Sequence, residues 1–338
     1  MKPLLLPLLA CPACRGELRF SALEELPQDE KREISEGRLA CQRCGAEYPL
    51  EAGVPRLGAA LGLKARRTRD DFAFEWKRYP GSLPEDEAVL LAESQLPAEA
   101  FRGKRVLDAG CGMGRYSVVA LSLGAEVVAL DLSDSLLRLA EEAPRRPKLH
   151  VVQADLLRPP LKPGQFDIVY SHGVLHHTCD AREAFLRVAE LVKPGGCLSV
   201  WLYGKAGRYE QFATNPLRAD RGWVARHRRL AWLVVGLRQF LSDAARIVTT
   251  RLPRRLTYLI CHGLAALGAV PLLRYLTFSV HPSFRVRLIE NFDWLSPPYQ
   301  SHHTKEELAQ WFAQAGFDIV GALPHGLVPK PGFLGRRR

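Results

Sequence analysis

The run VLDAGCGMGRYS at residues 106–117 constrains the fold of this chain more than any other segment. A short apolar stretch leads into a turn that holds Gly110, Gly112 and Gly114, and a helical stretch follows. A turn of this kind lets a ligand approach the backbone, and the start of the helix offers it free N–H groups. From Phe101 onward, similar β-rich runs alternate with helical stretches, which is typical of βαβ units and a parallel sheet. The sequence therefore predicts a doubly wound, Rossmann-like α/β fold.

The alternation also predicts where the elements lie and how the chain divides. We expect strands near 104–109, 126–131, 148–153, 166–171 and 196–203, with helices near 114–123, 134–143 and 181–192. The pattern stops after WLYGK and resumes at HTKEELAQWFAQAGFDIVGAL, where Thr304 and Glu307 form a capping box and Gly316 ends the helix before a strand. Five segments follow: a cysteine-bearing module at 1–58, a helical connector at 59–100, the Rossmann-like core at 101–204, a basic helical insertion at 205–282 and the C-terminal completion of the core at 283–338.

Three acidic residues close consecutive predicted strands. Asp108 precedes the glycine turn, Asp131 ends the second strand, and Asp155 follows the third. A carboxylate at Asp108 would repel the pyrophosphate of a nicotinamide cofactor, but it can hold the cationic amino group of a methionine moiety. Asp131 can accept hydrogen bonds from both hydroxyls of a ribose, and Asp155 can receive an adenine amino group. Each acid alone would equally fit a helix cap or a solvated loop, whereas the three together favour a nucleoside with a cationic tail.

These motifs resemble those of the class I methyltransferases that depend on S-adenosylmethionine (SAM). The resemblance covers 101–203 and 304–323, through VLDAGCGMGRY, ALDLS, QADLL, FDIVYSHGVLHH and LVKPGGCLSVW. It implies a seven-stranded methyltransferase sheet and a SAM pocket lined by Asp108, Gly110, Gly112, Gly114, Asp131, Leu132, Asp155 and Ser171. The aromatic cluster around Trp76 and Tyr79 resembles a segment that packs over SAM in some members, although ordinary core packing explains it equally well.

Two CxxC pairs, Cys11/Cys14 and Cys41/Cys44, predict a metal site near the N-terminus. Four thiolates close a tetrahedral shell, so a zinc ion held there is structural rather than catalytic. The flanking residues resemble Trm112-like zinc ribbons over about residues 5–58, which implies Zn²⁺ and a role as an activator or cap of a methyltransferase. The alternative is a ribbon that has lost its zinc. Cysteines used in this way also indicate a reducing, cytoplasmic compartment.

The net charge of +11 is concentrated in the predicted insertion. Residues 205–280 carry 13 Lys and Arg against three acidic residues, and 256–273 is an uncharged run of 18 residues. The run 256–273 is at the lower limit of length for a membrane span. A single crossing there, however, would leave the last predicted helix and strand on the other side of the membrane from the rest of the Rossmann-like sheet. We expect a helical lid or an interfacial hairpin that contacts an anionic membrane surface or covers an apolar substrate. The open alternatives are a helical subdomain with a solvated basic face and, less favoured, a tRNA-binding surface.

Methyl transfer needs a base only when the acceptor must lose a proton. The candidate groups are His172, His176 and His177 after the fourth strand, and Tyr299, His302 and His303 in the segment NFDWLSPPYQSHHT before the last helix. Histidine titrates in the useful range, so the two histidine clusters are the natural candidates, and we predict His172, His176, His302 and His303 as the catalytic residues. Both clusters also have a non-catalytic interpretation. His176 or His177 can simply cap or orient the following helix, and the segment NFDWLSPPYQSHHT can form a substrate wall without a role in proton transfer.

The leading functional hypothesis is a SAM-dependent methyltransferase acting on a small-molecule or lipid-like acceptor, in the cytoplasm or peripherally at the inner membrane surface. A tRNA-modifying methyltransferase is the second hypothesis. A SAM-binding regulator or scaffold without catalysis is the third. The sequence does not name the acceptor atom.

Overall fold

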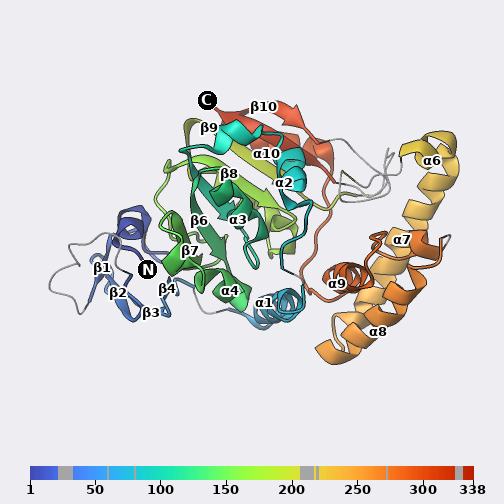
Figure 1. Cartoon of the computed structure of the whole chain (residues 1–338), viewed down its shortest axis with the longest axis horizontal. Helices are drawn as coiled ribbons and strands as arrows, with labels where there is room; N and C mark the ends of the chain where they lie inside the picture. Colours follow the sequence, from blue (N-terminus) through green and yellow to red (C-terminus); the bar gives the residue numbers. More distant parts are fainter. Residues whose placement is uncertain are drawn as a thin grey trace.

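The computed structural model describes residues 1–21, 33–58, 61–79, 81–205, 217, 221–271, 273–323 and 330–338. Figure 1 shows three parts: a small N-terminal sheet, a large central sheet flanked by helices, and a helical arm on the side opposite the small sheet. Of the predicted basic insertion, Arg208 and Arg218 lie outside the described residues.

The central sheet confirms the predicted α/β class. Its seven strands have the order β10-β11-β9-β8-β5-β6-β7, in which β5 to β9 are parallel and β11 is antiparallel to both of its neighbours. The chain leaves β5 toward β7 and then returns to place β8 on the other side of β5. The strand order therefore reverses between β5 and β8, which is where open α/β sheets bind ligands. The bounds are β5 (Arg105–Ala109), β6 (Glu126–Asp131), β7 (Leu149–Gln153), β8 (Phe166–His172), β9 (Val192–Trp201), β10 (Phe317–Ala322) and β11 (Gly332–Arg337).

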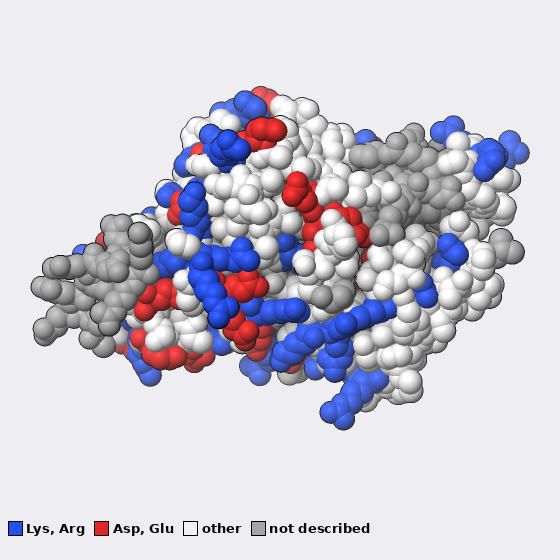
Figure 2. Space-filling view, viewed as in Figure 1, with Lys and Arg blue, Asp and Glu red and all other residues white. Residues whose placement is uncertain are grey.

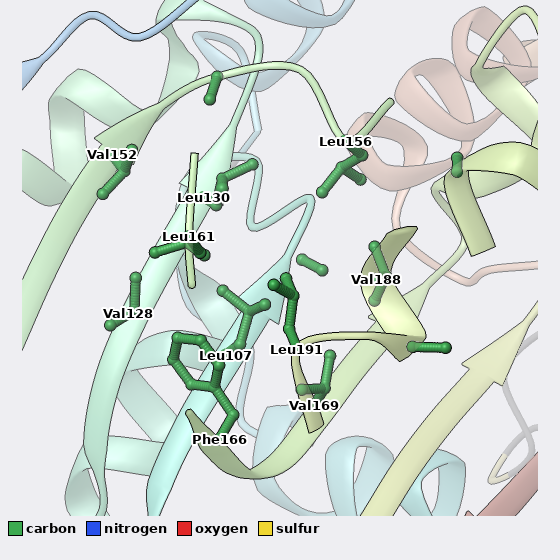
Figure 3. Close-up of a cluster of buried hydrophobic side chains, with 14 of the residues drawn as sticks. Leu107, Val128, Leu130, Val152, Leu156, Leu161, Phe166, Val169, Val188 and Leu191 are labelled. Carbon is green, nitrogen blue, oxygen red and sulfur yellow. The ribbon is translucent and has the colours of Figure 1, made fainter. Parts of the chain in front are cut away.

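Both faces of this sheet are covered because its strands are apolar on both sides. Leu107, Val128 and Val169 point to one face, where they pack with Val188 of α5 (Ala181–Ala189) and with Leu191 (Figure 3). Their strand neighbours point to the other face, against α3 (Arg115–Ser122) and α4 (Leu137–Ala140). This doubly covered sheet is the rigid support for the loops at its carboxyl edge.

One predicted helix differs from the structure. The range 134–143 holds a 3-10 helix at Asp134–Leu136, the short α4, and then a second 3-10 helix at Ala143–Arg145. Pro144 has no N–H to donate and disfavours the α conformation of the residue before it, so a regular helix cannot continue through this point. The capping box was predicted correctly: the Thr304 hydroxyl accepts from the N–H of Glu307, at the start of α10 (Lys305–Gln314).

The N-terminal part is a four-stranded antiparallel sheet that is bonded to the edge of the central sheet. Its strands are β1 (Leu18–Phe20), β2 (Gly37–Cys41), β3 (Glu47–Glu51) and β4 (Val54–Pro55), preceded by a 3-10 helix at Pro3–Leu8. The N–H of Leu57 donates to the carbonyl of Gln153 at the end of β7 (2.8 Å), and that of Ala10 donates to Pro160 (2.9 Å). Leu5 and Leu9 belong to the same buried cluster as the strand residues of the central sheet. The two sheets therefore share one hydrophobic core.

The helical arm is formed by α6 (Arg221–Arg226), α7 (Arg228–Thr249), α8 (Arg254–Leu267) and α9 (Phe284–Leu295). Cys261 and Ala265 of α8 pack with Leu288 and Phe292 of α9 in one buried cluster. Two further helices, α1 (Leu63–Trp76) and α2 (Asp86–Ser94), lie in the connector, and α1 is tied to the arm by the ion pair of Asp71 with Arg254 (2.6 Å). No helix in the described ranges is long and apolar enough to cross a membrane.

The shared core predicts that the N-terminal part contributes to the stability of the central sheet. Leu5→Ala should lower the free energy of unfolding of the whole chain by about 3 kcal/mol, because it opens a cavity in a core common to both sheets. Leu4 is the matched control on the same 3-10 helix, since its side chain is 46% exposed and that of Leu5 is 1% exposed. Denaturant unfolding followed by circular dichroism measures both variants. A loss for Leu5→Ala no larger than that for Leu4→Ala would contradict the shared core.

Candidate functional site

The glycine turn follows β5 and forms the floor of the site. Gly110 and Gly112 have φ angles of +93° and +55°, a region that L side chains rarely adopt. A Cβ at Gly110 would lie 2.3 Å from Val174, and one at Gly112 would lie 3.0 Å from the ring of Trp76. The turn therefore requires glycine for its backbone angles and for the close approach of Val174 and Trp76.

Asp131, at the end of β6, connects the glycine turn to the next loop. Its Oδ2 accepts from the N–H of Gly112 (2.8 Å), and its Oδ1 accepts from both the N–H and the hydroxyl of Ser133 (2.7 Å each). Burial raises the pKa of this carboxyl above its usual value, while the hydrogen bonds from Ser133 and Gly112 oppose that rise. Oδ2 accepts only one of these bonds, so its second lone pair can still accept a hydrogen bond from a ligand.

The first cavity opens above this turn and encloses about 720 Å³ of free space, its open mouth included. Gly110, Gly112, Asp131, Leu132 and Asp155 line it, together with Thr68, Phe72 and Trp76 from α1. Helix α1 thus covers the cavity from the side opposite the sheet.

The other predicted cofactor residues, Gly114, Ser171 and Asp108, do not line the first cavity. Gly114 does not line this cavity; a Cβ there would lie 2.6 Å from Leu139. Ser171 is buried, and its hydroxyl donates to the carbonyl of Ala109 (2.7 Å), so it links β8 to β5 beneath the turn. Asp108 lines an adjoining second cavity and accepts from the Ser117 hydroxyl (2.6 Å). Burial raises the pKa of Asp108 to about 7.

The second cavity contains residues that the sequence analysis did not single out. Gly110, His172, Phe72 and Trp76 line both cavities, so the two are continuous. The second is also lined by Glu75 of α1, Glu290 and Asp293 of α9, Arg115, and Tyr203 just after β9. These side chains come from elements far apart in the sequence. Asp293 lies within the segment NFDWLSPPYQSHHT that was predicted as a possible substrate wall.

The four candidate histidines have unequal access to these cavities. His172 lines both, but its Nε2 is 2.9 Å from the Ser199 hydroxyl, and burial lowers its pKa to about 4. His176 stacks on Tyr203 with ring centroids 3.9 Å apart, and it lines neither cavity. His302 and His303 also line neither. The neighbouring His177, which the sequence analysis named beside His176, does line the first cavity.

The four predicted metal ligands come together in the N-terminal sheet. The Sγ atoms of Cys11, Cys14, Cys41 and Cys44 all lie within 4.8 Å of one another, with 3.4 Å between Cys14 and Cys41 and 3.8 Å between Cys11 and Cys44. A tetrahedral zinc with bonds of about 2.3 Å separates its sulfurs by about 3.8 Å. This donor set fits a structural zinc ion.

Comparison with known families agrees with both resemblances. Residues 107–200 match the family model described as a methyltransferase domain, and residues 2–53 match the one described as Trm112p-like protein. The first match spans β5 to β9, including the glycine turn, Asp131 and Asp155. The second spans all four cysteines.

Individual relatives match mainly in the central sheet. The malonyl-[acyl-carrier protein] O-methyltransferase of Enterobacter lignolyticus is 40% identical over 31% of this chain and 41% of its own length. An uncharacterized chloroplastic methyltransferase of Arabidopsis thaliana is 26% identical over 56% of this chain and 59% of its own. The chain thus spans about two to three fifths of these relatives. The crystal structure of 1,6-didemethyltoxoflavin-N1-methyltransferase from Burkholderia thailandensis is 16% identical with a TM-score of 0.47, covering 90% of this chain and 99% of that one.

The thiolate cluster predicts that the N-terminal sheet depends on zinc. Metal analysis of the purified chain should find one zinc ion per molecule, and Cys14→Ser should lower the free energy of unfolding by more than about 3 kcal/mol because metal binding is coupled to folding. Cys179→Ser is the control, since Cys179 is exposed and lies outside the cluster. Equal stabilities of the two variants, or wild-type protein without zinc, would show that the cluster is not a structural metal site.

Proposed function

We propose that this chain, which joins a Trm112p-like segment to a methyltransferase domain, transfers a methyl group from SAM to a small-molecule or lipid-like acceptor. The observation that carries the proposal is the first cavity, where the glycine turn, Asp131 and Asp155 meet at the point at which the strand order reverses. Asp131 would hold the ribose hydroxyls and Asp155 the adenine amino group. Asp108 lies on the side of the second cavity, where it would face the cationic amino group of the methionine part.

Bound SAM would supply an electrophilic methyl group, so the chain's own contribution is to align the acceptor and exclude water. Trp76 and Phe72 contribute to the alignment of the acceptor and to the exclusion of water, because these two side chains line both cavities. Burial keeps His172 neutral at neutral pH and Ser199 occupies one of its nitrogens, so we assign it to orienting the cavity wall. The catalytic roles of His176, His302 and His303 stay predictions, and none of these side chains lines either cavity.

Part of the basic charge of the arm is used inside the protein, which weakens the tRNA alternative. Arg246 donates to the carbonyls of Trp294 and Pro297, Arg254 pairs with Asp71, and Arg238 is buried. These three side chains brace the helical arm, whereas other arginines of the arm are exposed. A non-catalytic regulator would bind SAM without turning it over.

The proposal predicts tight SAM binding that depends on Asp108. Asp108→Asn should weaken SAM binding by about tenfold or more, because a buried carboxylate is replaced opposite a cation. Wild-type affinity should rise between about pH 6 and pH 8, since a carboxyl with a pKa near 7 must ionise to hold the cation, and the variant should lack this rise. Isothermal titration measures both, with Asp318→Asn on the exposed edge strand β10 as the control.

Retained folding of Asp108→Asn is checked by thermal unfolding. If neither SAM nor S-adenosylhomocysteine binds wild-type protein below about millimolar concentration, the methyltransferase and the regulator hypotheses both fail. If SAM binds but no methylated product forms with any acceptor in a cell extract, the regulator hypothesis gains.

The outer surface of the arm supports contact with an anionic membrane. Its exposed apolar side chains recur at helical spacing on one face of each helix: Leu233, Leu237, Phe240, Leu241, Ile247 and Val248 on α7, and Leu256, Leu259 and Ile260 on α8. Exposed arginines lie at both ends of this stripe, with Arg228 and Arg229 at one end and Arg251 and Arg255 at the other. Figure 2 shows the arm largely white, with basic side chains toward its ends. An apolar face with flanking cations fits a helix pair lying in a lipid interface.

The stripe predicts flotation of the full chain with vesicles of phosphatidylcholine that contain about one quarter phosphatidylglycerol, and weaker flotation with phosphatidylcholine alone. Replacing Phe240 and Ile247 together by Glu should abolish flotation, because both side chains are more than 60% exposed and would carry charge into the lipid. Leu63→Glu on α1, where the leucine is 85% exposed, is the control. Flotation unchanged by the double substitution would rule out this face.

A further inference from the structure

Beyond the cofactor cavity, the second cavity continues into a third. The two share seven side chains, and we call the space that these bound the acceptor chamber: Tyr79, Arg115, Tyr116, Trp201, Tyr203, Glu290 and Asp293. Its walls come from α1, α3, α9 and the end of β9. It opens toward the cofactor cavity at Gly110 and His172, so a molecule in the chamber would lie beside a bound methyl donor.

A buried carboxylate without a partner lies at this opening. Glu75 lines the second cavity and is 4% exposed, and its Oε2 has no hydrogen-bond partner among the residues that the structure describes. Burial raises the pKa of this carboxyl well above its usual value, and the negative charges of Asp293, Asp71 and Glu290 raise it further. An isolated buried carboxylate is unfavourable unless a cation or a hydrogen-bond donor meets it.

The cations near the chamber already have anionic partners. Arg115 pairs with Asp86, and Lys330 pairs with Glu93. The Arg238 guanidinium lies 5.5 Å and 5.8 Å from the ring centroids of Phe278 and Trp294, and its positive charge opposes the rise that burial causes in the pKa of Glu290.

Among the described residues, neither Glu75 nor Asp293 forms an ion pair with a Lys or Arg side chain. The His177 imidazole lies 3.7 Å from Asp293, but burial lowers the pKa of His177, and Arg246 acts on Asp293 only through its longer-range charge. Asp293 accepts from the Tyr203 hydroxyl (2.7 Å), which is a neutral donor and does not cancel its charge. The chamber therefore brings together acids that burial and mutual repulsion hold back from ionising, and a bound cation would relieve that repulsion. An anionic acceptor, such as the malonyl group named for the Enterobacter relative, would be repelled there.

From this arrangement we infer that the acceptor chamber binds a cationic amine, whose nitrogen lies between Glu75 and Asp293. The inference rests on the proposed methyl transfer and specifies its acceptor. For transfer, the ammonium gives one proton to the Glu75 carboxylate, and the freed nitrogen lone pair forms the new N–C bond. The S–C bond breaks at the same time, and its electron pair turns the sulfonium into a neutral thioether.

The test measures binding of three probes of one size to the full chain saturated with S-adenosylhomocysteine. The probes are phenethylamine, phenethyl alcohol and phenylacetate, which place a cation, a neutral hydroxyl and an anion on similar frames. We expect the amine to bind at least about tenfold more tightly than either of the others. Glu75→Gln removes the charge with little change of shape and should abolish this preference. Glu87→Gln is the matched control, because Glu87 is exposed on the neighbouring helix α2.

The outcomes separate this inference from the proposed function. If S-adenosylhomocysteine binds but the amine has no advantage over the alcohol and the carboxylate, the amine assignment is wrong while the cofactor site stands. If Glu75→Gln weakens S-adenosylhomocysteine instead of the amine, Glu75 serves the cofactor and the assignment is again wrong. If S-adenosylhomocysteine does not bind wild-type protein at all, the proposed function itself fails. Thermal unfolding of Glu75→Gln, expected to be at least as stable as wild type near neutral pH, excludes misfolding as the cause.

Discussion

The carboxylate of Asp131 is the interaction on which the rest of the site depends. It holds the glycine turn through Gly112 and the following loop through Ser133, and these two segments form the floor of the first cavity. The same loop is also held by the end of β7 and by the N-terminal part. Gln153 donates to the carbonyl of Leu132 (3.2 Å) and to Asp134 (2.8 Å), and Arg56 of the N-terminal part also reaches Asp134 (3.0 Å). A continuous set of hydrogen bonds thus runs from the N-terminal part to the floor of the first cavity.

That continuity gives the N-terminal module a physical role beyond its own metal site. Strand β7 is the edge of the central sheet, and an uncovered edge exposes unpaired backbone groups. The N-terminal part covers it by backbone bonds at Leu57 and by the shared apolar core. Arg15 adds two bonds to the carbonyls of Pro159 and Leu161 in the loop after β7. The module therefore protects the edge strand and restrains the loop after it, which borders the first cavity through Asp155 and Leu156.

The sequence predicted what local pattern controls and missed what depends on long-range packing. Strands β5 to β8, the capping box at Thr304 and the convergence of the cysteines follow from periodicity, cap chemistry and spacing. Strand β11 was not predicted individually, because a glycine inside a strand looks like a break in the sequence pattern. In the structure, Gly335 makes room for the ring of Phe312, which would lie 2.5 Å from a Cβ at this position. Glu75 and Glu290 meet only because α1 and α9 pack across the sheet edge. Likewise, nothing in the letters HH shows that His176 lies behind Tyr203 while His177 faces the cavity.

The arrangement of α9 connects the outer face of the arm with the acceptor chamber. One side of α9 presents Glu290 and Asp293 to the chamber, and the other is bonded to α7: Arg246 donates to the carbonyl of Trp294 (2.7 Å), and Thr249 donates to that of Leu295 (2.8 Å). A displacement of α7 must carry α9 with it or break these bonds. Lipid contact at the outer face of α7 and amine binding at the inner face of α9 would therefore act on one packed unit. If the two events favour different positions of that unit, their binding free energies are coupled, and the coupling must be equal in both directions.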